Sequence, residues 1–258
     1  MVNPINIKKL SDRQFSQYCD LVYRESGINL TEEKRELLNA RIAKRLRVQK
    51  VNPDAYFTMI QRDPAEMKQF LDAVTTNHTF FFRESRSFAY LDKGCTKIWC
   101  AASSSGEEPY SLAIYCMEKG VRSSILATDI SVSCLEKGNS GIYPMQSVTG
   151  ISKPLLSKYF QKGRGRYQGF VRVKEHIRKR ITFGRFNLIK DTPDASTYDA
   201  VFCRNVMIYF DNEIKKQVVA KLSRVLRPGG YFIIGGAESL SGMQCGLQYI
   251  EPSVYRKP

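Results

Sequence analysis

The sequence predicts an α/β fold organised around a mostly parallel sheet, and two observations carry this prediction. The first is a run of strand, turn and helix patterns between residues 96 and 116, and the second is the alternation of strand-like and helical stretches after it. In the first run, T-K-I-W-C alternates β-forming with small residues, and the small-residue turn Ser103–Gly106 follows. Strands that alternate with helices form parallel sheets, whose ligands lie outside the carboxyl ends of the strands. We therefore expect a ligand at this turn.

The helix after the turn begins with Glu107, Glu108 and Pro109, and these residues indicate the kind of ligand. Acidic residues and proline are both favoured in a first helical turn. A dinucleotide site needs G-x-G-x-x-G and a phosphate loop needs G-x-x-x-x-G-K-[ST], but only Gly106 is present and no lysine follows it. Carboxylates repel phosphate and accept hydrogen bonds from a cationic or amino-bearing ligand. S-adenosylmethionine meets this requirement.

Asp129 ends the next strand-like run, S-I-L-A-T-D, which starts at Ser124. A carboxylate in this place can accept hydrogen bonds from both ribose hydroxyls of a nucleoside. It can also cap a helix that starts near Ser131. Taken together with the acidic turn, Asp129 favours the ribose interpretation.

The composition of the 258 residues indicates a soluble protein with an acidic partner. Forty Lys and Arg against 25 Asp and Glu give a formal charge of +15, which suits nucleic acid, an anionic surface or a carboxylate-rich protein. Seven scattered cysteines without a C-x-x-C pair are typical of a reduced cytosolic protein, and two histidines are too few for most zinc sites, so no metal is expected. No run approaches the ~18 apolar residues of a membrane span, and residues 1–10 lack the apolar centre of a signal peptide. We expect a cytoplasmic location.

The N-terminal part is predicted to be helical. Residues 11–14 (S-D-R-Q) have the form of a capping box, and apolar residues then recur at helical spacing from Phe15. This predicts a helix to about Glu25 that ends at Gly27.

A second helix is expected from near Thr31 until Asn52-Pro53, with short helical segments to about Val74. Together these elements predict an all-helical domain at residues 1–75, followed by a second domain at residues 76–258. The second helix carries basic residues on one face and no acid between Leu37 and Pro53. A solvated helix face and a docking face for an acidic partner both explain this pattern. The docking residues would be Arg41, Lys44, Arg45 and Arg47.

The stretch T-T-N-H-T-F-F-F-R-E at residues 75–84 joins the two domains. Three consecutive phenylalanines indicate packing against a larger body, which would leave the polar groups of Asn77, Thr79 and Arg83 without partners. Two interpretations stay open: a capped, buried helix start in which Arg83 pairs with Glu84 or another acid, or a segment that closes over the cofactor. We expect His78 to be a packing residue rather than a base.

From about residue 143 to 180 the pattern changes. Eleven Lys and Arg but one acid, Glu175, lie between residues 158 and 190, and glycines at 163, 165 and 169 precede F-V-R-V-K. Glycine turns followed by alternating apolar and basic residues predict a small antiparallel β-subdomain inserted in the α/β domain. The elements expected after it are a strand at 181–187, a strand at 198–204, a helix at 212–226 stopped by R-P-G-G, a strand at 231–235 and a closing antiparallel hairpin at 248–255.

Six motifs together resemble one family. They are T-T-N-H-T-F-F-F-R-E, S-S-S-G-E-E-P-Y-S-L-A, A-T-D-I, F-N-L-I, F-C-R-N-V-M-I-Y-F-D and L-R-P-G-G-Y-F, in this order over nearly the whole chain. The set is similar to the CheR family of chemotaxis receptor methyltransferases. The resemblance implies a class I S-adenosylmethionine-dependent methyltransferase fold, of Rossmann-like type, that methylates glutamate side chains on the cytoplasmic helices of chemoreceptors. By motif position it implies cofactor contacts from Asn77, Thr79, Arg83, Glu108, Asp129, Asn187, Leu188, Cys203, Arg204 and Asn205.

This reaction agrees with the scarcity of histidine. A glutamate carboxylate is ionised at neutral pH, so its attack on a methyl group needs alignment and desolvation more than a general base. A cation must hold the carboxylate, and Arg83 and Arg204 are candidates. Tyr209 can donate a hydrogen bond to the same carboxylate, or it can simply pack beside Phe210. We expect Arg83 and Tyr209 to be catalytic.

Two other functions are alternatives to this one. The charge of +15 also suits a nucleic-acid methyltransferase, but amino-directed members of that class have an Asn/Asp-Pro-Pro-aromatic turn where this chain has Cys203-Arg204-Asn205-Val206. A non-catalytic module of the same fold that binds receptors or RNA is the second alternative, against which Asp129 and Arg83 argue.

The inserted subdomain has two interpretations. It can be a charged hairpin that only caps the sheet, or its exposed edge can accept an extended peptide as an added strand. Some members of the resembling family tether themselves in this way to the receptor's C-terminal peptide. The residues expected to dock such a tail are Gly163, Gly165, Val171, Arg172 and Val173.

Overall fold

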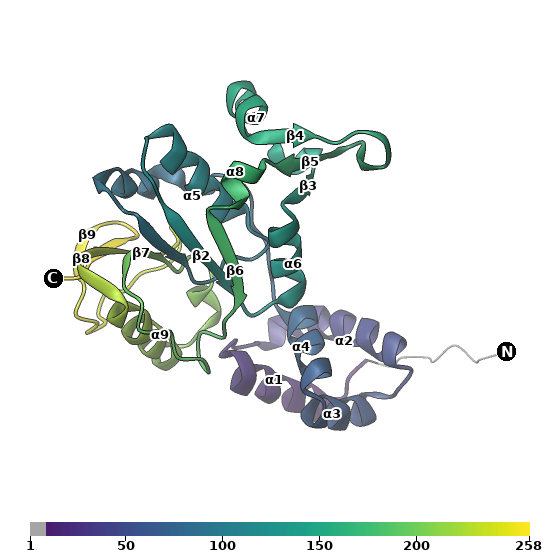
Figure 1. Cartoon of the computed structure of the whole chain (residues 1–258). Coiled ribbons are helices and arrows are strands. Elements are labelled where there is room, and N and C mark those ends of the chain that lie inside the picture. The colour runs from purple at the N-terminus through teal and green to yellow at the C-terminus, as the bar shows by residue number, and fades with distance from the viewer. Residues whose placement is uncertain (1–8) are drawn as a thin grey trace.

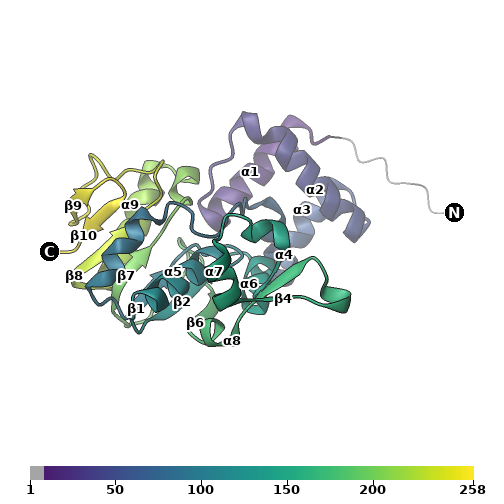
Figure 2. The same ribbon diagram turned by 90° about the horizontal axis from the view of Figure 1, so that it is seen from above.

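The computed structural model describes residues 9–258, with residues 92 and 93 described by their backbone alone. Residues 1–8 lie outside the described residues. The predictions that fall on them are the start of the helical domain and the lack of a signal-peptide centre. Figure 1 shows three parts: N-terminal helices, a main sheet with its helices, and a small inserted sheet. In both views the N-terminal helices and the insertion lie on the side away from the C-terminal hairpin (Figure 2).

The first helix begins and ends where the sequence predicted. α1 (Asp12–Ser26) begins at a complete capping box, in which the Ser11 side chain accepts from the Gln14 N–H and the Gln14 side chain accepts from the Ser11 N–H. It ends at Gly27 in the left-handed conformation, where glycine carries no steric penalty.

The second helix starts later than predicted. A short 3₁₀ turn, η1 (Glu32–Lys34), follows Thr31, which makes no side-chain cap, and precedes α2 (Arg35–Gln49). Asn52 caps α3 (Pro53–Arg62), and α4 (Pro64–Val74) follows. Tyr18, Tyr56 and Phe70 form the buried aromatic centre of this all-helical unit. The exact boundary between residues 75 and 76 stays a prediction.

The main sheet is mostly parallel with an antiparallel edge, as the sequence predicted. Its order is β6-β2-β1-β7-β8-β10-β9, in which the first five strands are parallel and the last two antiparallel. The strands are β1 (Lys97–Cys100), β2 (Ser124–Asp129), β6 (Ile181–Arg185), β7 (Tyr198–Phe202), β8 (Leu226–Ile233), β9 (Gln248–Glu251) and β10 (Val254–Arg256). The order reverses between β1 and β7, and such a switch point opens a crevice at the strand ends.

Alternating strand residues cover both faces of the sheet. Ile98, Cys100 and Phe202 belong to one buried cluster, whereas Trp99 and Val201 belong to another. The helices around the sheet are η2 (Ser85–Lys93), α5 (Glu107–Glu118), α6 (Val132–Ser140), η5 (Met207–Tyr209) and α9 (Asn212–Arg224). Both faces are therefore buried, as expected of a parallel sheet.

One predicted strand start is wrong. The R-P-G-G stretch does not precede β8 but lies inside it, and the register with β7 shifts there. Gly229, with φ +75°, donates to the Lys257 carbonyl, and the Gly230 carbonyl accepts from the Lys257 N–H. The glycines thus form an irregular strand start paired with the C-terminal segment.

The insertion is a three-stranded antiparallel sheet of order β3-β5-β4, with short helices around it. Val171 and Val173 are buried and Arg172 is exposed, as the alternation predicted. The expectation that these residues form an exposed edge is wrong, because β5 is the central strand and pairs on both sides. The elements are β3 (Ile142–Pro144), η3 (Met145–Val148), α7 (Lys153–Tyr159), β4 (Phe160–Lys162), η4 (Gly165–Tyr167), β5 (Phe170–Val173) and α8 (Glu175–Arg178).

Across residues 9–258, no helix has the length and apolar character that crossing a membrane requires.

Candidate active site

A pocket of about 380 Å³ lies at the carboxyl ends of the parallel strands, where the N-terminal helices meet the main sheet. Its walls come from the loops after β1, β2 and β7, from the segment at residues 75–83, and from α2 with the loop before it. The predicted site residues Asn77, Thr79, Arg83, Glu108, Asp129, Arg204, Asn205 and Tyr209 all line it. The structure therefore brings eight residues from four sequence regions to one cavity.

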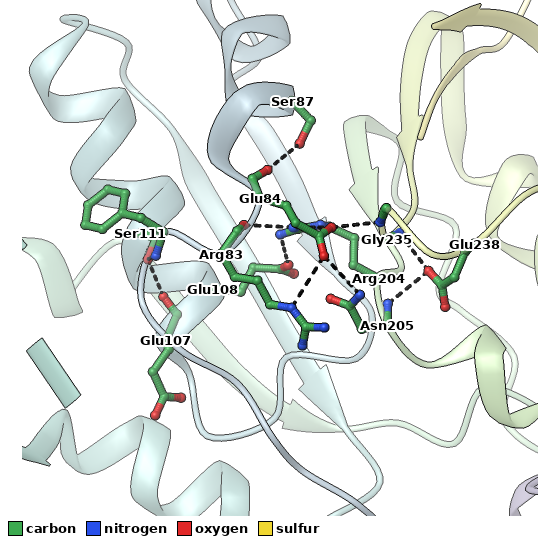
Figure 3. A network of polar contacts seen from close by, with 12 residues as sticks. Arg83, Glu84, Ser87, Glu107, Glu108, Ser111, Arg204, Asn205, Gly235 and Glu238 are labelled. Carbon is green, nitrogen blue, oxygen red and sulfur yellow. Dashed lines mark hydrogen bonds and ion pairs between the residues drawn. The ribbon is translucent and has the colours of Figure 1, made fainter. Parts of the chain in front are cut away.

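Glu108 and Arg204 form the buried polar centre of this site. Arg204 Nη1 donates to Glu108 Oε2 at 2.6 Å, and Nη2 donates to the Arg83 carbonyl at 2.8 Å and to Glu84 Oε2 at 3.1 Å (Figure 3). The Arg204 side chain is 2% exposed. Burial raises the pKa of the Glu108 carboxyl, although Arg204 opposes the shift. Arg204 is thus held between two carboxylates.

Glu107, the other acid of the turn, does not line the pocket. Its carboxylate accepts from the Ser105 hydroxyl at 2.7 Å and pairs with Lys137 at 3.6 Å. Figure 3 shows Glu107 and Glu108 pointing in different directions from the start of α5. Of the two acids, Glu108 is the one placed to meet a ligand.

Asp129 holds the two turns beside the pocket through backbone hydrogen bonds. Its Oδ2 accepts from the Ser104 N–H at 2.8 Å and its Oδ1 from the Ser131 N–H at 2.9 Å, so it fixes the turns after β1 and β2. The cap of α6 is Ser131, not Asp129. Burial raises the pKa of the Asp129 carboxyl, and the backbone N–H groups oppose the shift. Asp129 also lines the pocket.

Residues 75–79 and Arg83 line the pocket, and the segment leads directly into η2, whose N-cap position is Glu84. The Ser104 hydroxyl donates to the Asn77 carbonyl at 3.0 Å, which ties the segment to the small-residue turn. Phe81 is buried against Tyr143 and Phe160, as packing predicted, whereas Phe80 is 48% exposed. The predicted pairing of Arg83 with Glu84 is present, at 3.5 Å.

Arg83 and Tyr209, the two predicted catalytic residues, both line the pocket. Arg83 is anchored by a hydrogen bond to the His78 carbonyl at 3.2 Å, and its side chain is 26% exposed. Tyr209 ends η5, and its carbonyl accepts from the Asn29 N–H at 2.8 Å. Arg83 is thus more exposed and more weakly paired than Arg204.

Three predicted cofactor residues occupy other positions. Asn187 and Leu188 line a smaller adjoining cavity of about 50 Å³, together with Ile28 and Asp129. The Asn187 amide donates to the Glu25 carbonyl at 2.7 Å and accepts from the Ile189 N–H at 3.0 Å, so it holds α1 against the sheet. Cys203 lines neither cavity, because strand alternation turns it into the buried cluster on the α9 side.

The four basic residues of α2 do not share one role. Arg45 forms a buried pair with Glu66 of α4, at 2.6 Å. Arg41 donates to the Val74 carbonyl and lines the pocket. Burial lowers the pKa of Arg41. Of the four, only Lys44 and Arg47 are exposed, so these two are the remaining candidates for docking.

Sequence reasoning missed several residues of this site. Ile28 and Leu30, from the loop between α1 and η1, line the pocket as apolar groups. Glu84 accepts from the Gly236 N–H at 2.8 Å and from Arg204. Burial acts to raise the Glu84 pKa, but these hydrogen bonds outweigh it and lower the pKa. The R-E pair in the resembling motif was the available signal for Glu84, whereas no local signal marked the two apolar residues.

The residues of the pocket fit S-adenosylmethionine. Glu108 and Asp129 supply buried acceptors, and this ligand presents an amino group and ribose hydroxyls as donors. Ile28 and Ile130 supply apolar surface next to the smaller cavity, which is compatible with a nucleobase. S-adenosylmethionine is also cationic, and its positive charge is compatible with the two carboxylates. Among residues 9–258, no group of three or more His, Cys, Asp and Glu side chains is arranged to hold a metal.

The sheet order and the carboxylates at the ends of its strands agree with an S-adenosylmethionine-dependent methyltransferase, and the family comparison shows that class. Two family models match the chain: the CheR methyltransferase, SAM binding domain over residues 58–255, and the CheR methyltransferase, all-alpha domain over residues 13–75. The chain therefore belongs to the CheR methyltransferase family.

Curated relatives agree with this assignment. The chain is 36% identical over 249 residues to the chemotaxis protein methyltransferase of Salmonella typhimurium, covering 91% of this chain and 86% of the relative. It is 37% identical over 256 residues to chemotaxis protein methyltransferase 2 of Pseudomonas aeruginosa, covering 93% and 91%. A third relative, the chemotaxis protein methyltransferase of Borreliella burgdorferi, is 33% identical over 279 residues, covering 98% and 96%.

Proposed function

We propose that this methyltransferase esterifies glutamate side chains on the cytoplasmic helical bundle of chemoreceptors and acts in the cytoplasm. The observation that carries the proposal is the presence of Arg83 and Tyr209 in the same pocket as Glu108 and Asp129. The two carboxylates suit the cofactor, and the guanidinium and the phenol suit a carboxylate substrate. The names of the relatives, which are chemotaxis methyltransferases, support a receptor as the substrate.

The reaction places few demands on acid–base chemistry. Bound S-adenosylmethionine supplies a methyl group on a positively charged sulfur. A carboxylate oxygen of the substrate forms the new C–O bond while the C–S bond breaks, so the negative charge of one group and the positive charge of the other disappear together. Because both charges vanish, a dry pocket lowers the barrier, and the main task of the protein is alignment.

Arg83 is better placed than Arg204 to hold the substrate carboxylate. Arg204 is 2% exposed and already engaged by Glu108 and Glu84. Arg83 is more exposed, and its 3.5 Å contact with Glu84 is long for an ion pair. In this proposal Arg83 orients the carboxylate, Tyr209 donates to its second oxygen, and Arg204 organises the cofactor end of the pocket.

Receptor docking on the N-terminal helices is assigned to Lys44 and Arg47. Both are exposed on α2, whose Leu37 and Arg41 line the pocket, so a helix that reaches the pocket passes close to them. Attraction to the acidic side chains around the methylation sites would steer association and weaken with salt.

The insertion is proposed to bind the receptor's C-terminal tail along β4. The Gly163 N–H donates to the Phe170 carbonyl of β5, and the Tyr159 carbonyl accepts from the Lys174 N–H just after β5, so the backbone N–H and C=O of Lys162 point outward. The other edge, β3, is blocked, because the Ile142 N–H donates to Ser140 and Pro144 has no N–H.

A cavity of about 930 Å³ beside this edge can take side chains of the added peptide. Arg172, Tyr167 and Phe170 are among its lining residues, along with Gly163 and Gly165. A Cβ at Gly163 would lie 2.1 Å from the Tyr167 carbonyl oxygen, so only glycine fits this turn.

Methyl transfer from radiolabelled S-adenosylmethionine tests the function directly. The purified protein is incubated with a receptor cytoplasmic fragment, with the same fragment carrying alanine at its candidate glutamates, and with total RNA. We expect base-labile label in the first fragment only, because carboxyl methyl esters hydrolyse in base. Label in RNA would replace the proposal with nucleic-acid methylation, and cofactor or receptor binding without label would indicate a non-catalytic module.

A further inference from the structure

Glu238 holds the loop that carries Tyr209, although it lies outside the pocket lining. It follows β8, and its Oε2 accepts from the Gly235 N–H at 2.6 Å and from the Asn205 N–H at 2.9 Å. Its Oε1 accepts from the Ile208 N–H at 3.2 Å. Figure 3 shows the Glu238 carboxylate facing Asn205 and Gly235 beside the Arg204 network. One carboxylate therefore satisfies three backbone donors from two loops.

The loop so held has a backbone that needs support. Asn205 has φ +57°, in the left-handed region that non-glycine residues seldom adopt. A Cβ at Gly235 would lie 2.3 Å from Asn205 Nδ2, so the two loops approach as closely as a glycine allows. Ile208, whose N–H is the third donor to Glu238, directly precedes Tyr209 in the chain. The position of the Tyr209 backbone thus depends on Glu238.

The other side of the same loop is held by the N-terminal helices. The Asn29 N–H donates to the Tyr209 carbonyl at 2.8 Å, and the Tyr23 hydroxyl donates to Asp211 Oδ2 at 2.5 Å. Asp211 also caps α9, which fixes the end of the loop. The contacts to Glu238 therefore hold the loop from the opposite side.

We propose that Glu238 is a positioning residue for methyl transfer: its carboxylate fixes residues 205–209 so that the Tyr209 hydroxyl meets the substrate carboxylate. This inference rests on the proposed function, since it assumes the role given there to Tyr209. A carboxylate suits the task because all three partners are donors. Glutamine has the same shape, but its amide nitrogen would face an N–H group where an acceptor is needed.

The first test is a double-mutant cycle with Glu238→Gln and Tyr209→Phe, measured as kcat at saturating cofactor and receptor. Displacing a reacting group slightly is costly, so we expect Glu238→Gln to lower kcat on the order of tenfold to a hundredfold. If Glu238 acts through Tyr209, the double variant is no slower than the slower single variant. Glu136→Gln, on the exposed face of α6, is the control and keeps the rate of the unmodified protein. Single effects that multiply in the double variant would overturn the proposal.

The second test does not need activity. Hydrogen exchange of the peptide covering residues 205–209 should be faster in Glu238→Gln than in the unmodified protein, with exchange in β1 and β2 unchanged. Equal exchange in this segment would overturn the proposal even if the enzyme methylates receptors, whereas absent methylation by the unmodified protein would reject only the proposed function. If Glu238→Gln does not fold, Glu238→Asp, which keeps the charge on a shorter side chain, takes its place in both tests.

Discussion

Arg204 and Glu108 are 2.6 Å apart in a site where the arginine side chain is 2% exposed and the glutamate 12%. The pair joins the loop after β7 to the first turn of α5, so it links the two strands at which the sheet order reverses. Because the pair is buried, removing one partner leaves the charge of the other without water or a counter-ion. The arginine therefore has a structural role before any ligand binds.

Arg204→Ala should destabilise the fold strongly. Breaking a buried ion pair leaves an unpaired charge and costs about 3–5 kcal/mol of the free energy of unfolding. Urea denaturation followed by circular dichroism measures this loss. The control is Lys216→Ala, which breaks the exposed pair of Glu213 and Lys216 and should cost at most about 1 kcal/mol. Similar losses in both variants would show that the Arg204 pair is no more than a surface contact.

The stability contributed by Glu108 should fall as pH rises. Burial raises its pKa in the folded protein above the ordinary value of 4.5, so the folded state binds the proton more tightly than the unfolded chain does. This contribution is complete below the unfolded pKa and is lost as pH rises through the folded pKa. The difference in free energy of unfolding between the unmodified protein and Glu108→Gln should accordingly decrease above pH 4.5, in denaturation curves at several pH values. A difference that grows with pH would contradict this sign.

Asp129→Ala should weaken cofactor binding. The change removes a buried acceptor from the pocket, and losing charge-assisted hydrogen bonds costs about 1.5–3 kcal/mol. Calorimetric titration with S-adenosylhomocysteine measures the change. Asp199→Ala is a matched control, because Asp199 also accepts backbone N–H groups, from Thr96 and Lys97, but does not line the pocket. Unchanged affinity in Asp129→Ala would remove Asp129 from the cofactor site.

Much of the fold could be predicted because its signals are local. The strand-like run Ser124–Asp129, the capping box at Ser11 and the glycine at 27 each determine structure within a few residues. The candidate pocket was predictable for the same reason, since the turn after β1 and the acid at the end of β2 sit where parallel strands end.

The remaining features depend on contacts between distant segments. Arg45 pairs with Glu66, 21 residues away. It therefore packs against α4 and does not belong to the basic docking face that the charge pattern predicted. Strand order decides that β5 is central, and no local pattern encodes strand order. Glu238 acts on Asn205 across 33 residues, through backbone groups that the sequence does not display.

The basic residues of α2 should separate into two classes when they are replaced. Arg45→Ala breaks a buried pair in which Glu66 also accepts from Tyr56 at 2.6 Å, so it should cost about 3–5 kcal/mol of stability. Lys44→Glu with Arg47→Glu should leave stability within about 0.5 kcal/mol of the unmodified protein, since both side chains are exposed.

The same charge reversal should raise the KM for receptor several-fold at low salt and leave cofactor affinity unchanged. Added salt should reduce the difference, because screening weakens attraction between exposed charges. Initial rates at varied receptor and salt concentrations measure both effects. Equal KM values at low salt would make these residues an ordinary solvated face.

Tail binding along β4 should depend on one backbone N–H. Lys162→Pro removes the outward-facing donor of this edge, whereas Lys162→Ala keeps the donor and removes only the side chain. A peptide from the C-terminus of a cognate receptor, titrated by calorimetry, should bind the alanine variant and fail to bind the proline variant.

Arg172→Glu and Gly165→Val should also abolish binding of this peptide. Gly165 has φ +57°, a conformation that a β-branched residue such as valine seldom adopts. All these variants should bind S-adenosylhomocysteine normally, since β4 and β5 do not line its pocket. Tight binding by Lys162→Pro would show that the peptide uses another surface, and no binding across a panel of cognate tails would leave the insertion without a tethering role.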